Sequence, residues 1–591
     1  MSDAPLTHSG NTVLLLLLVS LLFPVPALAQ DSDTSRDFAI VGINVIPMDE
    51  ERRLDNQTVV VTGGVIQSVS DTAATTLPPG LHQISGEGRY LMPGLVDLHI
   101  HLRHEDELVS NLAWGVTTVM HLGGSGELGQ RLLGYRKEIR DGTRLGPNIY
   151  TTGRILDGDP AVASSAVSLA TPEQARAAVK DLKSDGYDFI KTYNNVSQPV
   201  FAAIVDEANR QSLSVFGHVP RNFDALSALT GGQDAVVHTE EFFFTYFEGP
   251  RSTANMSRDF EPDMSKLPAL VKALVDNDVA VMPDLSFTFT NLLMWDGLEN
   301  VWSDPEFAYL QPDTASMWQA GNINRRDNLE NFIVRGQWKY NLMQELTIEF
   351  QKAGILQVIG TDASLPGLFP GKAVHRELTE LVKAGTSNYD ALAMGTANAG
   401  EFVKRYLDKD VLVGQIVPGY RADFVILNDD PLQDVRNARA IGAVVVNGVY
   451  TDKSQLDERR AEQRARYAIF NGARDNVDSA LLLESPDAPI QELLQDHREN
   501  PDILKAIERR INAAGYAAAF AAELDRSEQL LELNTRLFPL SANTWDSLAE
   551  IVLGRGDDER AVQLYRKALE VDPTFTNAAE NIDRILENTE R

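Results

Sequence analysis

The stretch PGLVDLHIHL, residues 93–102, places two histidines in a segment that is otherwise mostly apolar. Its composition favours a buried β-strand, in which residues i and i+2 point to the same side. His99 and His101 therefore share one face near the carboxyl end of the predicted strand. A pair of this kind is a weak signal by itself, so its meaning depends on what the other predicted strands carry.

Short apolar strands alternate with helical stretches between about residue 94 and residue 405, a pattern typical of repeated β-α units. Eight segments have the composition of strands, and eight such units in a region of this size predict a (β/α)8 TIM barrel over residues 94–405. The predicted strands are 96–101, 115–122, 148–153, 189–193, 214–219, 235–239, 279–286 and 356–364.

Both flanks of the predicted barrel show the alternating apolar and polar pattern of β-strands. The first flank is residues 38–93, with a turn at Gly63-Gly64, and the second is residues 406–455. We expect the two flanks to combine into one composite β-sandwich. The chain is therefore predicted to be α/β, with a barrel between two halves of a small β domain.

The region 456–591 is charged and helical, and part of it matches a known repeat. Residues 542–575 carry the spacing of one 34-residue tetratricopeptide unit. The matching positions are Trp545, Leu548, Ala549, Gly556, Ala561, Tyr565, Ala568 and Pro573. A pair of amphipathic helices that packs on the barrel is the alternative interpretation. A repeat would permit a protein partner or self-association through this region.

Several predicted barrel strands end in residues of the types that bind metals. Lys191 lies in DFIKTY, His218 in GHVP, His238 in HTE and Asp362 in GTDAS. Taken singly, each residue could be a buried polar group satisfied by a hydrogen bond, and the lysine could reach outward between helices. The active sites of these barrels form where the carboxyl ends of the strands meet, so six such residues together favour a metal site.

The motifs PGLVDLHIH, DFIKTY, GHVP, HTE and GTDAS occur in the order seen in the amidohydrolase superfamily. Over residues 38–455 the chain resembles the binuclear, imidazolonepropionase- and prolidase-like branch of that superfamily. The resemblance implies that His99, His101 and Asp362 hold one metal ion and that His218 and His238 hold a second. It also implies that Lys191 is carboxylated and bridges the two ions. Imidazole and carboxylate ligands in a chain without cysteine favour zinc.

A secreted or periplasmic hydrolase is the function that this resemblance implies. Metal-activated hydroxide would attack a carbonyl, and Asp362 would carry the proton to the leaving group. The favoured substrate is a small molecule or short peptide: a dipeptide, an Xaa-Pro-like amide or an N-acyl amino acid. An esterase, lactonase or phosphotriesterase is the alternative on the same site. A third interpretation is a binding protein that works through its C-terminal repeat and has an inert barrel.

Three further residues are candidates for substrate contacts: His121, Tyr193 and His375. Packing is the alternative role for each of them. Residues 287–350 form a long connection that contains Trp295, Trp302, Trp318 and Trp338. We expect this connection to be a helical lid with an aromatic pocket over the site, with a plain packing helix pair as the alternative.

Charge and composition limit the partners and the compartment. The formal net charge of −31 argues against nucleic acid as a partner. The absence of cysteine excludes disulfides and thiolate chemistry. Residues 13–23 are apolar, and Ala27 and Ala29 stand in A-x-A spacing, which predicts a signal peptide over residues 1–29 and a periplasmic or secreted protein. An uncleaved membrane anchor is the alternative.

Overall fold

The computed structural model describes residues 36–124, 126–162, 165–247, 262–297, 299–320, 329–483 and 485–589. The predicted signal peptide, residues 1–29, lies outside them. The chain from Arg36 to Arg591 is one compact unit. Among the described helices, none is both long enough and apolar enough to cross a membrane.

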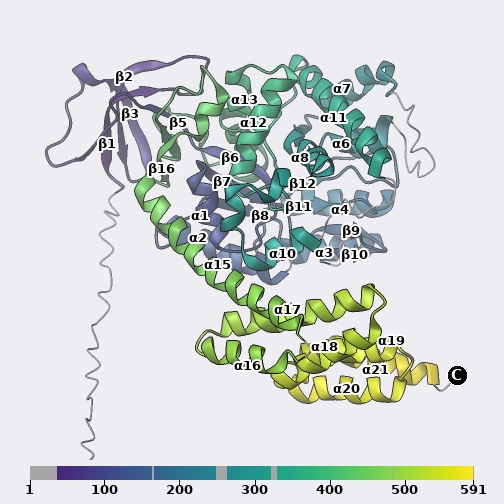
Figure 1. Ribbon diagram of the computed structural model, residues 1–591. Helices are drawn as coiled ribbons and strands as arrows, with labels where there is room; N and C mark the ends of the chain where they lie inside the picture. The colour runs from purple at the N-terminus through teal and green to yellow at the C-terminus, as the bar shows by residue number, and fades with distance from the viewer. Residues whose placement is uncertain are drawn as a thin grey trace, which may run out of the picture. The chain divides into compact units, whose positions relative to one another are not determined.

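Strands from both flanks of the central region form one mixed sheet of eight strands. In Figure 1 the purple strands of the first flank lie beside the green strand β16 of the second. The two flanks meet where β15 pairs antiparallel with β5, Phe424 opposite Pro93. Apolar side chains from both flanks share one buried cluster, so this sheet is sandwich-like, as expected. The strands are β1 Phe38–Val45, β2 Leu54–Thr62, β3 Val65–Asp71, β4 His82–Ser85, β5 Tyr90–Pro93, β15 Phe424–Leu427, β16 Ile441–Val446 and β17 Val449–Asp452.

The central region contains two parallel sheets. Three strands form the first, in the order β6-β7-β8, and six form the second, in the order β10-β9-β11-β12-β13-β14. Seven of the eight predicted strands have a counterpart here. The first sheet consists of β6 Leu95–Ile100, β7 Val116–His121 and β8 Asn148–Thr151. The second consists of β9 Leu156–Gly158, β10 Val167–Leu169, β11 Phe189–Thr192, β12 Ser214–Gly217, β13 Ala235–Val237 and β14 Ala280–Met282.

The prediction of an eighth strand over residues 356–364 is wrong. This segment contains isolated bridges and no regular strand. Asp362 has a positive φ of 60°, which interrupts the extended backbone that a strand requires. The segment still links the sheets, because Val358 N donates to Val281 O (3.1 Å) and Leu98 N donates to Ile359 O (2.9 Å). Residues 356–364 therefore lie between β14 and β6, where the eighth strand was expected.

Helices alternate with the central strands, and a helical insertion follows β14. The first group comprises α1 Asp106–Ala113, α2 Gly126–Asp141, α3 Pro172–Ser184, α4 Gln198–Gln211, α5 Ala225–Thr230, α6 Glu240–Phe242 and α7 Leu267–Asp276. The insertion comprises α8 Leu285–Asp296, α9 Glu299–Trp302, the 3-10 helix η4 Pro305–Tyr309, α10 Pro312–Ala320 and α11 Leu329–Lys352. Helices α12 Lys372–Ala384, α13 Asn388–Met394 and α14 Ala397–Phe402 follow residues 356–364. The expected helical character of residues 287–350 is thus confirmed for the described part.

Seven helices end the chain. They are α15 Lys453–Leu481, α16 Asp487–Asp496, α17 Pro501–Phe520, α18 Leu524–Leu537, α19 Ala542–Gly554, α20 Asp558–Val571 and α21 Thr576–Thr589. Helix α15 begins with a capping box in which Asp452 and Gln455 bind each other's backbone amides. The predicted repeat, residues 542–575, spans α19 and α20, whose Leu548 and Tyr565 share one buried cluster. That it is a tetratricopeptide unit stays a prediction.

Candidate metal centre

Four histidines from three strand ends converge in the central region. His99 lies in β6 and His101 directly after it, while His218 follows β12 and His238 follows β13. The ring centroids of His99 and His238 are 4.5 Å apart, and those of His218 and His238 are 5.0 Å apart. His99, His218 and His238 are buried, and the side chain of His101 is 21% exposed. The structure therefore brings together the imidazoles that the sequence pattern selected.

Apolar side chains form a layer on the inner face of the central strands. In the sequence they come shortly before the polar residues of the site. Phe189, Phe216 and Met282 belong to one buried cluster, and the residues two positions later are Lys191, His218 and Asp284. Residues two apart in a strand share a face, so these polar groups continue the inner face beyond the apolar layer. His99 and His238 depart from this spacing, because the apolar residues Leu98 and Val237 come directly before them, and the pairing of β6 with β7 shifts register between Asp97 and Ile100.

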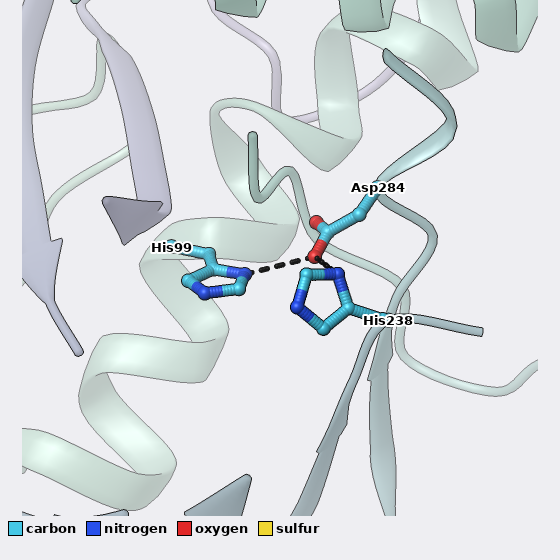
Figure 2. A group of neighbouring side chains, drawn as sticks. All are labelled: His99, His238 and Asp284. Carbon is cyan, nitrogen blue, oxygen red and sulfur yellow. Dashed lines mark hydrogen bonds and ion pairs between the residues drawn. The ribbon is translucent and has the colours of Figure 1, made fainter. Parts of the chain in front are cut away.

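One buried carboxylate, Asp284, orients two of the imidazoles (Figure 2). Its Oδ2 lies 2.8 Å from Nδ1 of His99 and 2.7 Å from Nδ1 of His238. An imidazole whose Nδ1 donates to an oxygen keeps the lone pair of Nε2 for a metal. The hydrogen bond to Asp284 thus fixes the tautomer of His99, and the close contact with Oδ2 turns the Nε2 atom of His238 away from Asp284. These three residues also form a group whose ligand atoms lie within 4.8 Å of one another.

The other two imidazoles are anchored in the same way. Nδ1 of His101 lies 2.9 Å from the carbonyl oxygen of Gly123. Nδ1 of His218 lies 2.8 Å from Oδ1 of Asn194 and 3.1 Å from Oε1 of the buried Glu241. Burial lowers the pKa of His218 to about 4, which favours the neutral, metal-binding form. All four Nδ1 atoms therefore face oxygen acceptors.

The carboxylate of Asp362 faces the Nε2 side of three histidines. Its Oδ1 lies 3.1 Å from Nε2 of His101 and 3.3 Å from Nε2 of His99, and its Oδ2 lies 3.7 Å from Nε2 of His238. Burial raises the pKa of Asp362, but the neighbouring histidines and Lys191 outweigh burial and hold that pKa below its ordinary value. His99, His101 and Asp362 form a second group with ligand atoms within 4.8 Å of one another.

Lys191 is the residue whose surroundings most need an explanation. Its side chain is buried, and Nζ has no hydrogen-bond partner among the described residues. Burial lowers its pKa to about 8. An unpaired buried ammonium is costly, and a neutral lysine, or a carboxylated lysine whose negative charge is balanced by metal ions, avoids that cost. The donor set of imidazoles and carboxylates around it fits a divalent metal centre.

Three residues of this centre have left-handed backbone conformations. The φ angles are 69° at His238, 52° at Asp284 and 60° at Asp362. Non-glycine residues in this region cost on the order of 1 kcal/mol each and cluster at functional sites. Gly360 supplies space beside them, because a methyl group there would collide with Asp284 and His99.

A cavity of about 590 Å³ opens onto the histidines, Lys191 and Asp362. Tyr193 lines it with its ring centroid 4.3 Å from that of His218, and burial raises the pKa of Tyr193 to about 12. Phe287 lines it too, whereas Trp295, Trp302, Trp318 and Trp338 are not among the described lining residues. Of the aromatic residues in the predicted lid, Phe287 therefore lines the cavity, and the four tryptophans are not among the described residues that do.

The other two candidate substrate contacts lie away from the cavity wall. Nδ1 of the buried His121 accepts a hydrogen bond from Leu102 N (3.1 Å), and its ring centroid is 6.2 Å from that of His101. Nε2 of His375 lies 2.8 Å from the carbonyl oxygen of Trp114. Neither histidine is among the described residues that line the cavity. The hydrogen bonds of His121 and His375 are consistent with a packing role for both residues.

Sequence reasoning missed Asp284 and Glu241. Asp284 was placed inside the predicted strand 279–286, although β14 ends at Met282. Its position after an apolar strand was the same signal that selected Asp362. Glu241 follows His238 in HTEE and binds His218 and Arg221. A carboxylate three residues after a candidate ligand was the available signal for it.

No protein-family model matches the chain. Ochratoxinase from Aspergillus niger is 24% identical over 479 residues, which cover 70% of this chain and 85% of that protein. Among solved structures, bottromycin amidohydrolase has a TM-score of 0.58 at 24% identity and covers 74% of this chain and 91% of its own. A Xaa-Pro dipeptidase with bound methionine in its active site has a TM-score of 0.52 at 17% identity, covering 70% and 100%. The chain shares the fold of these proteins.

Proposed function

We infer that this chain is an enzyme of the amidohydrolase type, in the prolidase- and ochratoxinase-like branch, and propose that it hydrolyses the amide bond of a short peptide or an N-acyl amino acid. One observation carries the proposal. Four imidazoles whose Nδ1 atoms face oxygen atoms surround one carboxylate and one buried lysine that has no partner among the described residues. Such an arrangement is costly for folding and is accounted for by a bound metal centre.

His99, His101 and Asp362 would hold one divalent ion, and His218 and His238 a second, with carboxylated Lys191 between them. The unpartnered Nζ of Lys191 and its pKa near 8 support this modification, because only the neutral amine reacts with CO2. The donor set of nitrogen and oxygen without sulfur favours zinc. Bound ions of this kind activate a water and polarise a carbonyl group.

The protein groups around the cavity have separate parts in this reaction. Asp362 can accept a proton and return it to the leaving amine, since its carboxylate is ionised and faces the cavity. The hydroxyl of Tyr193 stays protonated at neutral pH and can donate a hydrogen bond to a substrate carbonyl or carboxylate. Asp284 keeps the rings of His99 and His238 in place throughout.

The cavity and the relatives support the proposed substrate class. A volume of about 590 Å³ accommodates a dipeptide-sized molecule. The Xaa-Pro dipeptidase of the same fold holds methionine in its active site. We therefore favour a substrate with an amino-acid leaving group over esters, lactones and phosphotriesters.

Elemental analysis combined with a substrate panel tests the proposal. The full chain, purified with zinc and bicarbonate, is expected to hold about two zinc equivalents. It should cleave Xaa-Pro dipeptides, other dipeptides or N-acyl amino acids faster than aryl esters or a phosphotriester, and a chelator should abolish this activity. The variant Lys191→Ala should lose metal and activity, and His82→Gln, at an exposed histidine of β4, should keep both. Turnover of esters alone would overturn the amide assignment.

Export and the C-terminal repeat complete the proposal. Residues 1–29 support export to the periplasm or the medium through their apolar run and A-x-A site. N-terminal sequencing of the exported protein should begin at Gln30, and a retained Met1 would contradict cleavage. The spacing of residues 542–575 supports a tetratricopeptide unit, which would serve a protein partner or self-association.

A further inference from the structure

Helix α15, at the start of the C-terminal helical region, contacts two segments that border the metal cavity. One is the start of α1, which comes shortly after the cavity-lining residues Leu102 and Arg103. The other is the insertion between β14 and residues 356–364, which includes η4. Tyr467, Gln463 and Arg460, which make contacts with these segments, are largely buried, whereas Arg466 is exposed.

The first contact joins α15 to the start of α1. The hydroxyl of Tyr467 and the guanidinium of Arg466 both donate to Oδ2 of Asp106, at 2.5 Å and 2.6 Å. Tyr467 and Asp106 are 361 residues apart in the chain. Burial raises the pKa of Asp106, but hydrogen bonds from His104, Tyr467 and Arg466 outweigh burial and keep the carboxylate ionised.

The first turn of α1 connects this contact to the cavity wall through the residue after Asp106. Oε2 of Glu107, the residue after Asp106, accepts from Arg103 N (3.1 Å) and from the hydroxyl of Ser364 (3.0 Å). Nε of Arg103 donates to the carbonyl oxygen of Ser364 (3.1 Å). Ser364 lies two residues after Asp362. Hydrogen bonds on the neighbouring residues Asp106 and Glu107 therefore link α15 to the segment that carries the proposed catalytic carboxylate.

The second contact joins α15 to the insertion. Arg460 donates to Oε2 of Glu306 at 2.5 Å, and these side chains are only 12% and 9% exposed. The guanidinium carbon of Arg460 lies 3.7 Å from the ring centroid of Tyr309, and Gln463 donates to the carbonyl oxygen of Tyr309 (2.8 Å). Further along the insertion, Nε1 of the buried Trp318 donates to the carbonyl oxygen of Ser364 (3.2 Å). Both routes from α15 thus reach Ser364.

We propose that α15 is a positioning element of the active site, which holds the β6–α1 connection and the insertion in the arrangement that shapes the cavity beside Asp362. Tyr467, Arg466 and Arg460 are its positioning residues. This inference rests on the proposed function for the identity of the site. It gives the C-terminal region a role that needs no external partner.

The test compares two ion-pair variants of the full chain. Tyr467→Phe with Arg466→Gln removes both donors to Asp106. Arg510→Gln is the control, because Arg510 pairs with Asp478 inside the C-terminal region. We expect the first variant to raise KM for the amide substrate about tenfold, with kcat changed less than about twofold, and the control to change neither. Zinc content should stay equal in both.

Hydrogen exchange measured by mass spectrometry supplies a readout that does not depend on activity. Peptides covering residues 101–112 should exchange faster in the first variant than in the control, while those covering β6 stay protected. If the double variant does not fold, Tyr467→Phe alone carries the same test. Equal KM and equal exchange in variant and control would overturn the inference. A wild-type chain without amidase activity would overturn the proposed function, and the exchange measurement would still decide the role of α15.

Discussion

The metal centre and the C-terminal helices follow local structural rules to very different degrees. In the centre, Lys191 is buried with no partner among the described residues, and three residues have positive φ angles. In the C-terminal region, α15 and α17 begin with side-chain caps, at Asp452 and Asn500, and only Ala522 among its described non-glycine residues has a positive φ. Natural sequences are locally consistent except where function demands otherwise, so the contrast separates the part that performs chemistry from the part that supports it.

Substitution of Asp362 should show the largest effect in this comparison. Asp362→Asn keeps the shape but removes the group that accepts the proton, so kcat should fall by about 10²- to 10⁴-fold. Steady-state kinetics on the preferred amide measures it. Asp429→Asn, at an exposed aspartate, is the matched control and should retain full activity. An Asp362→Asn variant within tenfold of wild type would contradict the catalytic role.

Substitution of Asp284 should have a smaller effect on the same centre. Asp284→Asn weakens the acceptor that fixes the Nδ1 protons of His99 and His238. Loss of such an orienting group typically costs about 10- to 100-fold in metal affinity or activity. Competition with a zinc chelator measures the affinity, with Asp429→Asn again as the control. Unchanged zinc affinity and unchanged kcat would show that Asp284 does not orient the imidazoles.

A site residue can be predicted from the sequence when the element that carries it is regular. His218 and Asp362 were found because an apolar run predicts the strand or strand-like segment and the residue at its end is conspicuous. Asp284 was missed because β14 ends at Met282, two residues before it, and Asp284 itself is left-handed with a φ of 52°, so the predicted strand 279–286 ran past Pro283, the residue that marks the turn. The placement of His375 against Trp114 depends on how α12 packs beside α1, which periodicity does not determine.

Substitution of Gly360 tests how closely the centre is packed. Gly360→Ala places a methyl group against Asp284 and His99, and overpacking of this kind costs about 1–3 kcal/mol. We expect a lower free energy of unfolding in urea and a reduced zinc content. A variant as stable as wild type and fully loaded with zinc would show that the centre can expand.

Gly472, in the middle of α15, is the counterpart of Gly360 in the supporting region, and the same substitution there should have the opposite sign. A methyl group at Gly472 meets no atom within 4 Å, and the residue is exposed on the helix. Alanine is favoured over glycine in a helix interior by about 0.5–1 kcal/mol. Gly472→Ala should therefore raise the unfolding free energy slightly and leave kcat, KM and zinc content unchanged. Because α15 is proposed to position the cavity wall through Tyr467, Arg466 and Arg460, a stiffer helix that keeps those side chains should not disturb the site. A change in KM without a change in stability would mean that α15 must bend at Gly472 during turnover.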